Sequence, residues 1–149
     1  MSSPVFADST IWLTTAVEQP LNGEELEKAR TKKLFLNPLA NEMSVLGSVV
    51  LHAIGINAAT GQVEQDIELF EVLDPEPIHS LNSFASPTPI LDGTMLYCHF
   101  GDLGTACLNT ESKTIVWKAQ LASKHSVGPG SSHTVTTDLL IFLFPATTK

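Results

Sequence analysis

The chain has 149 residues, a length that fits one domain large enough to bury a core. Hydrophobic residues make up 43% of the chain and charged residues only 16%, which excludes a disordered, highly charged polymer. Sixteen acidic residues against eight lysines and arginines give a formal net charge of -8, so the chain lacks the basic surface that nucleic acid requires, and no nucleic-acid partner is predicted.

The first residues, MSSPVFADSTIW, lack the basic region and the uninterrupted apolar core of a signal peptide. No run of about eighteen apolar residues occurs in the sequence, so no membrane span is predicted. The default expectation is therefore a cytoplasmic chain.

Residues 22–43, NGEELEKARTKKLFLNPLANEM, differ from their surroundings because they are rich in Glu, Lys, Ala and Leu. The first half of this segment predicts a short helix, and the whole segment reads as an insertion between strands. A mixed-charge helix of this kind is typical of a solvated surface element, and binding of a partner is the alternative.

Residues 55–65, GINAATGQVEQ, predict a strand, a tight turn and a second strand. Asn57 and Thr60 are expected to hold the turn through side-chain to backbone hydrogen bonds, while Gly61 supplies a positive φ. The three residues are therefore interpreted as structural.

Residues 86–118 predict a four-stranded antiparallel meander, because turn signals recur at intervals too short for helices. Asp92-Gly93 marks the first hairpin, and the sequence GDLG marks the second turn. A second copy of the strand-turn-strand phrase, CLNTESKTIVW, ends this meander, with Asn109 aligned on the earlier Asn57 and with Trp117 at its end.

Placing the second turn at Asp102 and Leu103 predicts a register in which Cys98 faces Cys107. Both faces of the meander are then largely apolar, so both are expected to be covered. The predicted faces are Leu96, Cys98, Phe100 and Cys107 on one side, and Met95, Tyr97, Ala106 and Leu108 on the other. Opposed cysteines fit a disulfide, and buried free thiols are the other interpretation.

Internal repeats indicate the fold class. The opening SPVFADSTIWL resembles SPTPILDGTMLY further along, and GSSHTVTTDLLIFLF begins a third copy. We therefore predict an all-β chain, a partial β-propeller of four-stranded antiparallel blades with a short helical insertion in the first blade. As one incomplete domain over 1–149, it has blade one at 3–73 with its insertion at 22–43, blade two at 86–121, and the start of blade three at 130–145.

The five histidines do not have the spacing of metal ligands, so neither a metal site nor a catalytic residue is predicted. His79 and Asn82 lie in a turn-rich connection that enters a new repeat, and loops on rigid scaffolds often carry binding. The candidate ligand or partner contacts are His79, Asn82, His99 and His125. Structural histidines and a turn-forming asparagine are the alternative interpretation.

The repeat phrases resemble those of the PQQ-like β-propellers, the quinoprotein-dehydrogenase-like superfamily, whose blades end in A-x-D-x-x-T-G-x-x-x-W. The first phrase keeps Thr60-Gly61 and has Asn57 for the Asp, while the second keeps the Trp as Trp117. Residues 79–118 also look like the corresponding run in bacterial propeller proteins, often of planctomycete type. The resemblance implies that Trp117 packs between neighbouring blades.

Three functions follow as hypotheses. The resemblance implies a non-catalytic propeller repeat module, or a truncated remnant of one, that acts by protein or ligand binding. A fragment of a PQQ-dependent quinoprotein dehydrogenase is the second hypothesis, although Asn57 and Asn109 replace the acid in both phrases. An unrelated β-rich structural protein is the third.

No cofactor is predicted for the first hypothesis, and PQQ with calcium belongs to the second. A propeller closes with about four to eight blades, so two blades and part of a third leave apolar edges open. Self-association, or a protein partner that covers those edges, is therefore expected. Related propellers are often exported, so the resemblance gives export as the alternative to the cytoplasmic localisation expected by default.

Overall fold

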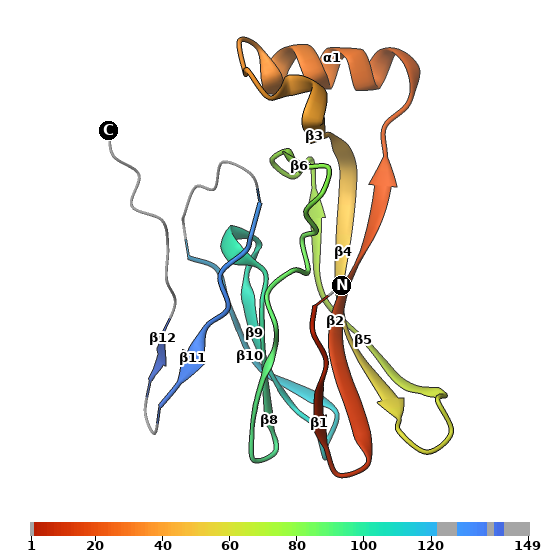
Figure 1. Ribbon diagram of the computed structural model, residues 1–149, viewed down its shortest axis with the longest axis vertical. Coiled ribbons are helices and arrows are strands. Elements are labelled where there is room, and N and C mark those ends of the chain that lie inside the picture. Colours follow the sequence, from red (N-terminus) through yellow and green to blue (C-terminus); the bar gives the residue numbers. More distant parts are fainter. Residues whose placement is uncertain (1, 122–127, 137–138, 142–149) are drawn as a thin grey trace.

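The computed structural model describes residues 2–121, 128–136 and 139–141, and is built mainly from antiparallel strands (Figure 1). Within these ranges the strands form two four-stranded sheets and two two-stranded sheets, and α1 is the one α-helix. The first large sheet contains, in spatial order, β1 (Val5–Ala7), β2 (Thr10–Pro20), β4 (Leu46–Asn57) and β5 (Val63–Leu73). The second contains β7 (Ile90–Asp92), β8 (Met95–His99), β9 (Thr105–Asn109) and β10 (Thr114–Ala119).

The first sheet is an antiparallel meander in which β2 and β4 pair over most of their length. Because side chains alternate between the two faces of a strand, β4 buries Val49, Leu51 and Ala53 completely while their neighbours stay partly exposed. The face that these residues form is one wall of the hydrophobic core.

Asn57 organises the turn between β4 and β5. Its Oδ1 atom accepts hydrogen bonds from the backbone N–H groups of Ala59 at 2.9 Å and Thr60 at 3.1 Å. The Thr60 hydroxyl accepts one from the Gln62 N–H at 3.3 Å, and Gly61 has a φ of 71°. The turn thus has the hydrogen bonds and the left-handed residue that the sequence predicts.

The turn between β9 and β10 repeats this geometry. Asn109 Oδ1 accepts hydrogen bonds from the backbone N–H groups of Glu111 at 3.0 Å and Ser112 at 2.9 Å. Lys113 has a φ of 60°, so it adopts the left-handed conformation at the position where the first phrase has Gly61. The two phrases therefore share one backbone shape although their sequences differ.

The predicted register of the second sheet is wrong by one residue. Cys107 faces Tyr97 and not Cys98, and Thr105 faces His99. The reason is the length of the β8–β9 turn, which contains the short 3-10 helix η2 (Gly101–Leu103) and closes with a hydrogen bond from Phe100 N–H to the carbonyl of Gly104 at 2.8 Å.

This register places Cys98 and Cys107 on opposite faces of the sheet, and both are free thiols. The disulfide interpretation is therefore wrong. Cys98 lies on the inner face, whose fully buried members are Leu96, Cys98, Phe100, Ala106 and Leu108. Burial raises the pKa of both thiols.

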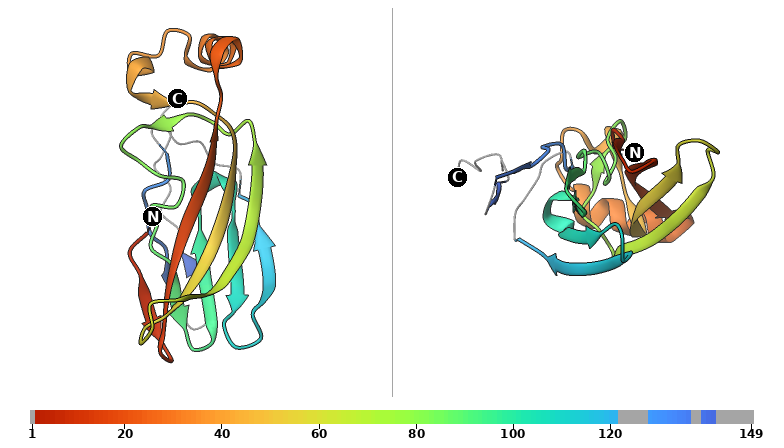
Figure 2. Two further views of the ribbon diagram at one scale, coloured as in Figure 1. Left: turned by 90° about the vertical axis from the view of Figure 1, so that its right-hand side faces the viewer. Right: turned by 90° about the horizontal axis from the view of Figure 1, so that it is seen from below.

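The inner face of the second sheet packs against the first sheet, and the strands of both run along the long axis of the molecule (Figure 2). The connection between the sheets contributes Phe84, Ala85, Pro87 and Pro89 to the buried interior. One core therefore joins the two sheets, as expected for face-to-face packing of apolar sheet surfaces.

Phe70 of β5 connects the two sheets at the β8–β9 turn. Its ring meets Phe100 edge to face, with centroids 6.1 Å apart, and Lys118 Nζ lies 5.1 Å from its centroid. A Cβ atom on Gly104 would come within 2.6 Å of the same ring. The contact explains why this turn contains a glycine.

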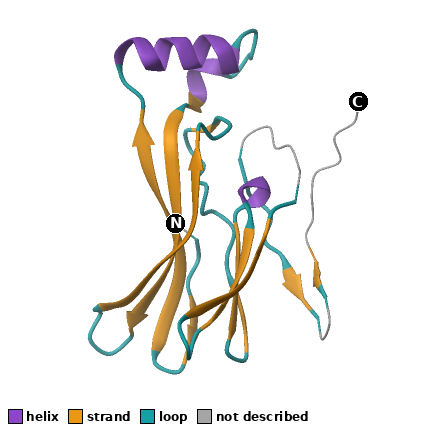
Figure 3. Cartoon of the chain, turned by 180° about the vertical axis from the view of Figure 1, so that it is seen from behind, coloured by secondary structure: helices purple, strands orange, loops and turns teal. Residues whose placement is uncertain are grey.

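The insertion contains α1 (Gly23–Leu34) and the 3-10 helix η1 (Ala40–Glu42), and it lies across one end of the molecule (Figures 1 and 3). The predicted helix in the first half of 22–43 is confirmed. Arg30 donates to the carbonyls of Ala40 at 2.6 Å and Met43 at 3.2 Å, and Lys33 donates to those of Asp74 and Pro75.

The predicted all-β class is confirmed at the coarse level, as antiparallel sheets of two to four strands with one helix in the described residues. No sheet within those ranges is closed. A two-stranded sheet pairs β3 (Met43–Ser44) with β6 (Ile78–His79), and another pairs β11 (Thr134–Val135) with β12 (Leu140–Ile141). Residues 137–138 and 142–145 of the predicted third blade lie outside the described residues.

The predicted burial of Trp117 is wrong, since its side chain is 38% exposed. Trp117 lies on β10, the edge strand of the second sheet, and the β11–β12 hairpin covers only part of the face on which it lies.

Among the described helices, none combines the length and apolar character that a bilayer crossing needs.

Candidate functional site

His79 lies at the end of β6 and holds its own loop. Its Nδ1 accepts a hydrogen bond from the Leu81 N–H at 3.1 Å, so the ring proton is on Nε2. Nε2 donates to the carboxylate of Glu42 at 2.9 Å. Because Glu42 belongs to η1, this bond ties the insertion to the connection between the sheets.

Asn82 joins the same connection to the segment before β11. Its Oδ1 accepts hydrogen bonds from the Ser86 hydroxyl at 2.6 Å and the Ser83 N–H at 2.8 Å, and its Nδ2 donates to the carbonyl of Pro129 at 3.2 Å. A Cβ on Gly128 would lie 2.8 Å from that Nδ2. The side chain therefore cross-links chain segments in the described structure.

His99 lies on the outer face of the second sheet and is paired with a histidine that the sequence did not single out as its partner. The rings of His99 and His133 meet edge to face with centroids 5.6 Å apart. His99 Nδ1 lies 2.8 Å from the Thr105 hydroxyl, and His133 Nε2 donates to the carbonyl of Tyr97 at 3.2 Å. His125, the fourth candidate, lies outside the described residues.

Burial favours the neutral form of both histidines. It lowers the pKa of His99 to about 4, with a smaller contribution from the neighbouring His133. It also lowers the pKa of His133, while the hydrogen bond to Tyr97 opposes that shift. The pair therefore packs the segment before β11 onto the sheet as two neutral rings at neutral pH.

The four predicted contacts do not form one site. His79 and Asn82 occupy the inter-sheet connection, whereas His99 belongs to the outer face of the second sheet. The structure instead brings together residues of that outer face, such as Asp92 and Trp117, to which the sequence analysis gave a turn or repeat role and no binding role. Only the predicted apolar character of both sheet faces pointed toward this surface.

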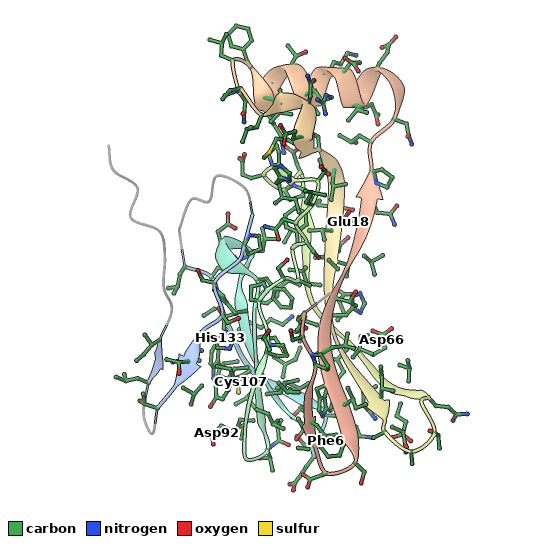
Figure 4. All side chains as sticks on the ribbon, in the orientation of Figure 1. Phe6, Glu18, Asp66, Asp92, Cys107 and His133 are labelled. Carbon is green, nitrogen blue, oxygen red and sulfur yellow. The ribbon has the colours of Figure 1, made fainter. Side chains whose placement is uncertain are left out.

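A pocket lies on the outer face, between the second sheet and the β11–β12 hairpin. Its volume is about 290 Å³, and it is lined by Asp92, Tyr97, Trp117, Val135, Thr136, Leu139 and Leu140. Figure 4 shows Asp92, Cys107 and His133 on the same side of the molecule. Tyr97 and Trp117, from β8 and β10, are adjacent aromatic rings with centroids 6.2 Å apart.

The β10 edge continues this surface. All six residues of β10 are exposed, and no strand in the described ranges pairs with its outer side. Val116 is 52% exposed and Ile115 36%, and Leu121 follows at 48%. Unpaired strand edges with apolar side chains are sites at which another chain can add a strand.

Comparison with the models of known protein families and with curated protein sequences gives no match. The resemblance to the PQQ-like propellers therefore stays a prediction, and the geometry of this outer surface is the basis for a function.

Proposed function

We propose that the chain is a non-catalytic repeat module of the PQQ-like β-propeller type that acts by binding protein along the β10 edge. The observation that carries this proposal is the exposed, unpaired β10 strand at the end of a sheet whose inner face is fully buried. A second copy of the chain presents the same edge, so two copies can pair through β10 in an isologous contact.

The contrast between the two faces of the second sheet supports this proposal. On the inner face, Leu96 and Leu108 are fully buried against the first sheet. On the outer face, the hairpin leaves Trp117 38% exposed. A partner strand beside β10 would bury apolar side chains and satisfy backbone N–H and C=O groups at the same time.

The residues that replace the acid of the repeat phrase do not fit a calcium–quinone site. Asn57 and Asn109 each use Oδ1 to accept two backbone hydrogen bonds in their turns. Within the described ranges, no three His, Cys, Asp or Glu side chains gather in a way that could hold a metal ion. The two asparagines therefore act as turn-forming residues and give no support to a dehydrogenase reaction.

Sedimentation velocity on the full chain tests the proposal. We expect self-association at about 100 µM, the range in which weak interfaces form. Val116→Lys places a charge on the open edge and should shift the chain to monomer. Val17→Lys is the matched control, because Val17 is 47% exposed on β2 and not part of β10.

A monomer at this concentration would contradict binding between copies. Equal dissociation by the two lysine variants would instead assign the association to a surface other than β10.

A further inference from the structure

Two aromatic rings, those of Tyr97 and Trp117, line the pocket between the second sheet and the β11–β12 hairpin. The rings of Tyr97 and Trp117 lie 6.2 Å apart with an interplanar angle of 50°, so they are not stacked on one another. Because Trp117 is 38% exposed, part of its surface is open to a ligand. The faces of aromatic rings attract cations, and Trp does so most strongly.

Asp92 adds a negative charge to the same pocket. Its carboxylate lies near enough to the phenol to help raise the pKa of Tyr97, after the larger effects of burial and of Cys107. In the part of the chain that the structure describes, Asp92 forms no ion pair. The net charge of -8 also favours the approach of a cation.

The neighbouring lysine of β10 does not occupy this pocket. Lys118 lies over the ring of Phe70, 5.1 Å from its centroid, and Phe70 packs between the two sheets. Trp117 lies on the opposite face, beside Tyr97. Phe70, on the inner side of the sheet, thus has Lys118 of the same chain as its cation. No such lysine contact is seen in the described residues for the rings of Tyr97 and Trp117 on the outer side, so these rings can contact the cation of a ligand.

We propose that this pocket binds the ammonium group of a small organic cation, such as a quaternary ammonium compound. The two rings contact the cationic head, the Asp92 carboxylate balances its charge, and the apolar residues of the hairpin, Val135, Leu139 and Leu140, contact its alkyl part. A volume of about 290 Å³ fits a ligand of this size and not a large cofactor. The proposal does not depend on self-association through β10.

Nuclear magnetic resonance of the tryptophan indole N–H groups tests the site. The chain has two tryptophans, and Trp12 is only 3% exposed in the core. On titration with choline chloride, the Trp117 signal should shift saturably while the Trp12 signal stays in place. The titration is run on the full chain and repeated at about tenfold lower protein concentration, so that association through β10 does not obscure the result.

The neutral isostere 3,3-dimethylbutanol separates cation binding from simple apolar filling of the pocket. It should bind at least about tenfold more weakly than choline, because it lacks the charge that the rings and the carboxylate attract. Asp92→Asn should weaken choline binding by about fivefold or more, and Tyr97→Leu should do the same while keeping the Trp117 signal.

Glu18→Gln is the matched control, since Glu18 is an exposed acid on β2, far from Asp92 in Figure 4. It should leave choline binding unchanged, and an unshifted Trp12 signal in each variant reports that the core is intact. Equal shifts with choline and its isostere, no shift of Trp117 at all, or equal losses in Asp92→Asn and Glu18→Gln would each overturn the proposal.

Discussion

Gly104→Ala tests how the two four-stranded sheets are joined. Gly104 has a φ of 142°, a conformation that residues with a side chain rarely adopt, and its added Cβ would lie 2.6 Å from Phe70 Cζ and 2.7 Å from Phe70 Cε1. The ring is held by Phe100 on one side and by Lys118 on another, so it has little freedom to move away.

The expected loss of stability has two parts. Holding alanine in this backbone conformation costs about 1 to 3 kcal/mol, and forcing the methyl group against a packed ring costs about 1 to 3 kcal/mol more. Gly104→Ala should therefore lower the free energy of unfolding by about 2 to 6 kcal/mol. Urea denaturation followed by tryptophan fluorescence, to which the buried Trp12 contributes, measures this loss.

Two further variants separate the parts. Gly93 also has a positive φ, 56°, and a Cβ there would meet no atom within 4 Å, so Gly93→Ala reports the smaller strain of alanine in the left-handed α region without a clash. In a Phe70→Leu background, Gly104→Ala should cost at least about 1 kcal/mol less than it does alone. If Gly104→Ala costs no more than Gly93→Ala, and its cost is the same with Phe70→Leu, the contact between the sheets does not exist as described.

Three other outcomes are expected. Since the pKa of His99 falls from 6.5 to about 4 on folding, only the unfolded state binds that proton between these values, so His99 alone should lower the free energy of unfolding by about 2 kcal/mol from pH 7 to pH 5, and the drop should be smaller by about that amount in His99→Gln. If the free energy of unfolding depends equally on pH in the unsubstituted chain and in His99→Gln, this reasoning is refuted. A mild disulfide-forming oxidant should not remove two hydrogens from the native monomer, because Cys98 and Cys107 lie on opposite faces; a loss of two hydrogens in the folded monomer would contradict the register. Lys113→Gly should raise the free energy of unfolding by about 1 kcal/mol by relieving a left-handed lysine, and a destabilised variant in thermal unfolding would count against the turn geometry.

The parts of the structure that the sequence predicts well are those decided by neighbours in the chain. The Asn57 turn forms from a side-chain oxygen and backbone N–H groups two and three residues away, and α1 forms within a run of helix-favouring residues. The second four-stranded sheet follows for the same reason, since short turns leave each of its strands beside the previous one, whereas the insertion separates β2 from β4 in the first sheet.

Tertiary structure decided the register between β8 and β9 and, through it, which residues lie on the outer face of the second sheet. Gly101 and Gly104 both allow positive φ, so the sequence permits turns of different length between β8 and β9, and packing of Phe70 against Gly104 fits the longer one. That one-residue difference moved Cys107 to the outer face, because side chains alternate along a strand.

The candidate site depended on tertiary structure even more. His99 and His133 come together from distant parts of the chain, and no spacing rule connects them. The sequence by itself determined that Trp117 belongs to a strand, but its burial depends on what covers that face of the sheet. The hairpin covers the face only in part, and this packing of separate segments leaves the aromatic pocket and the β10 edge open.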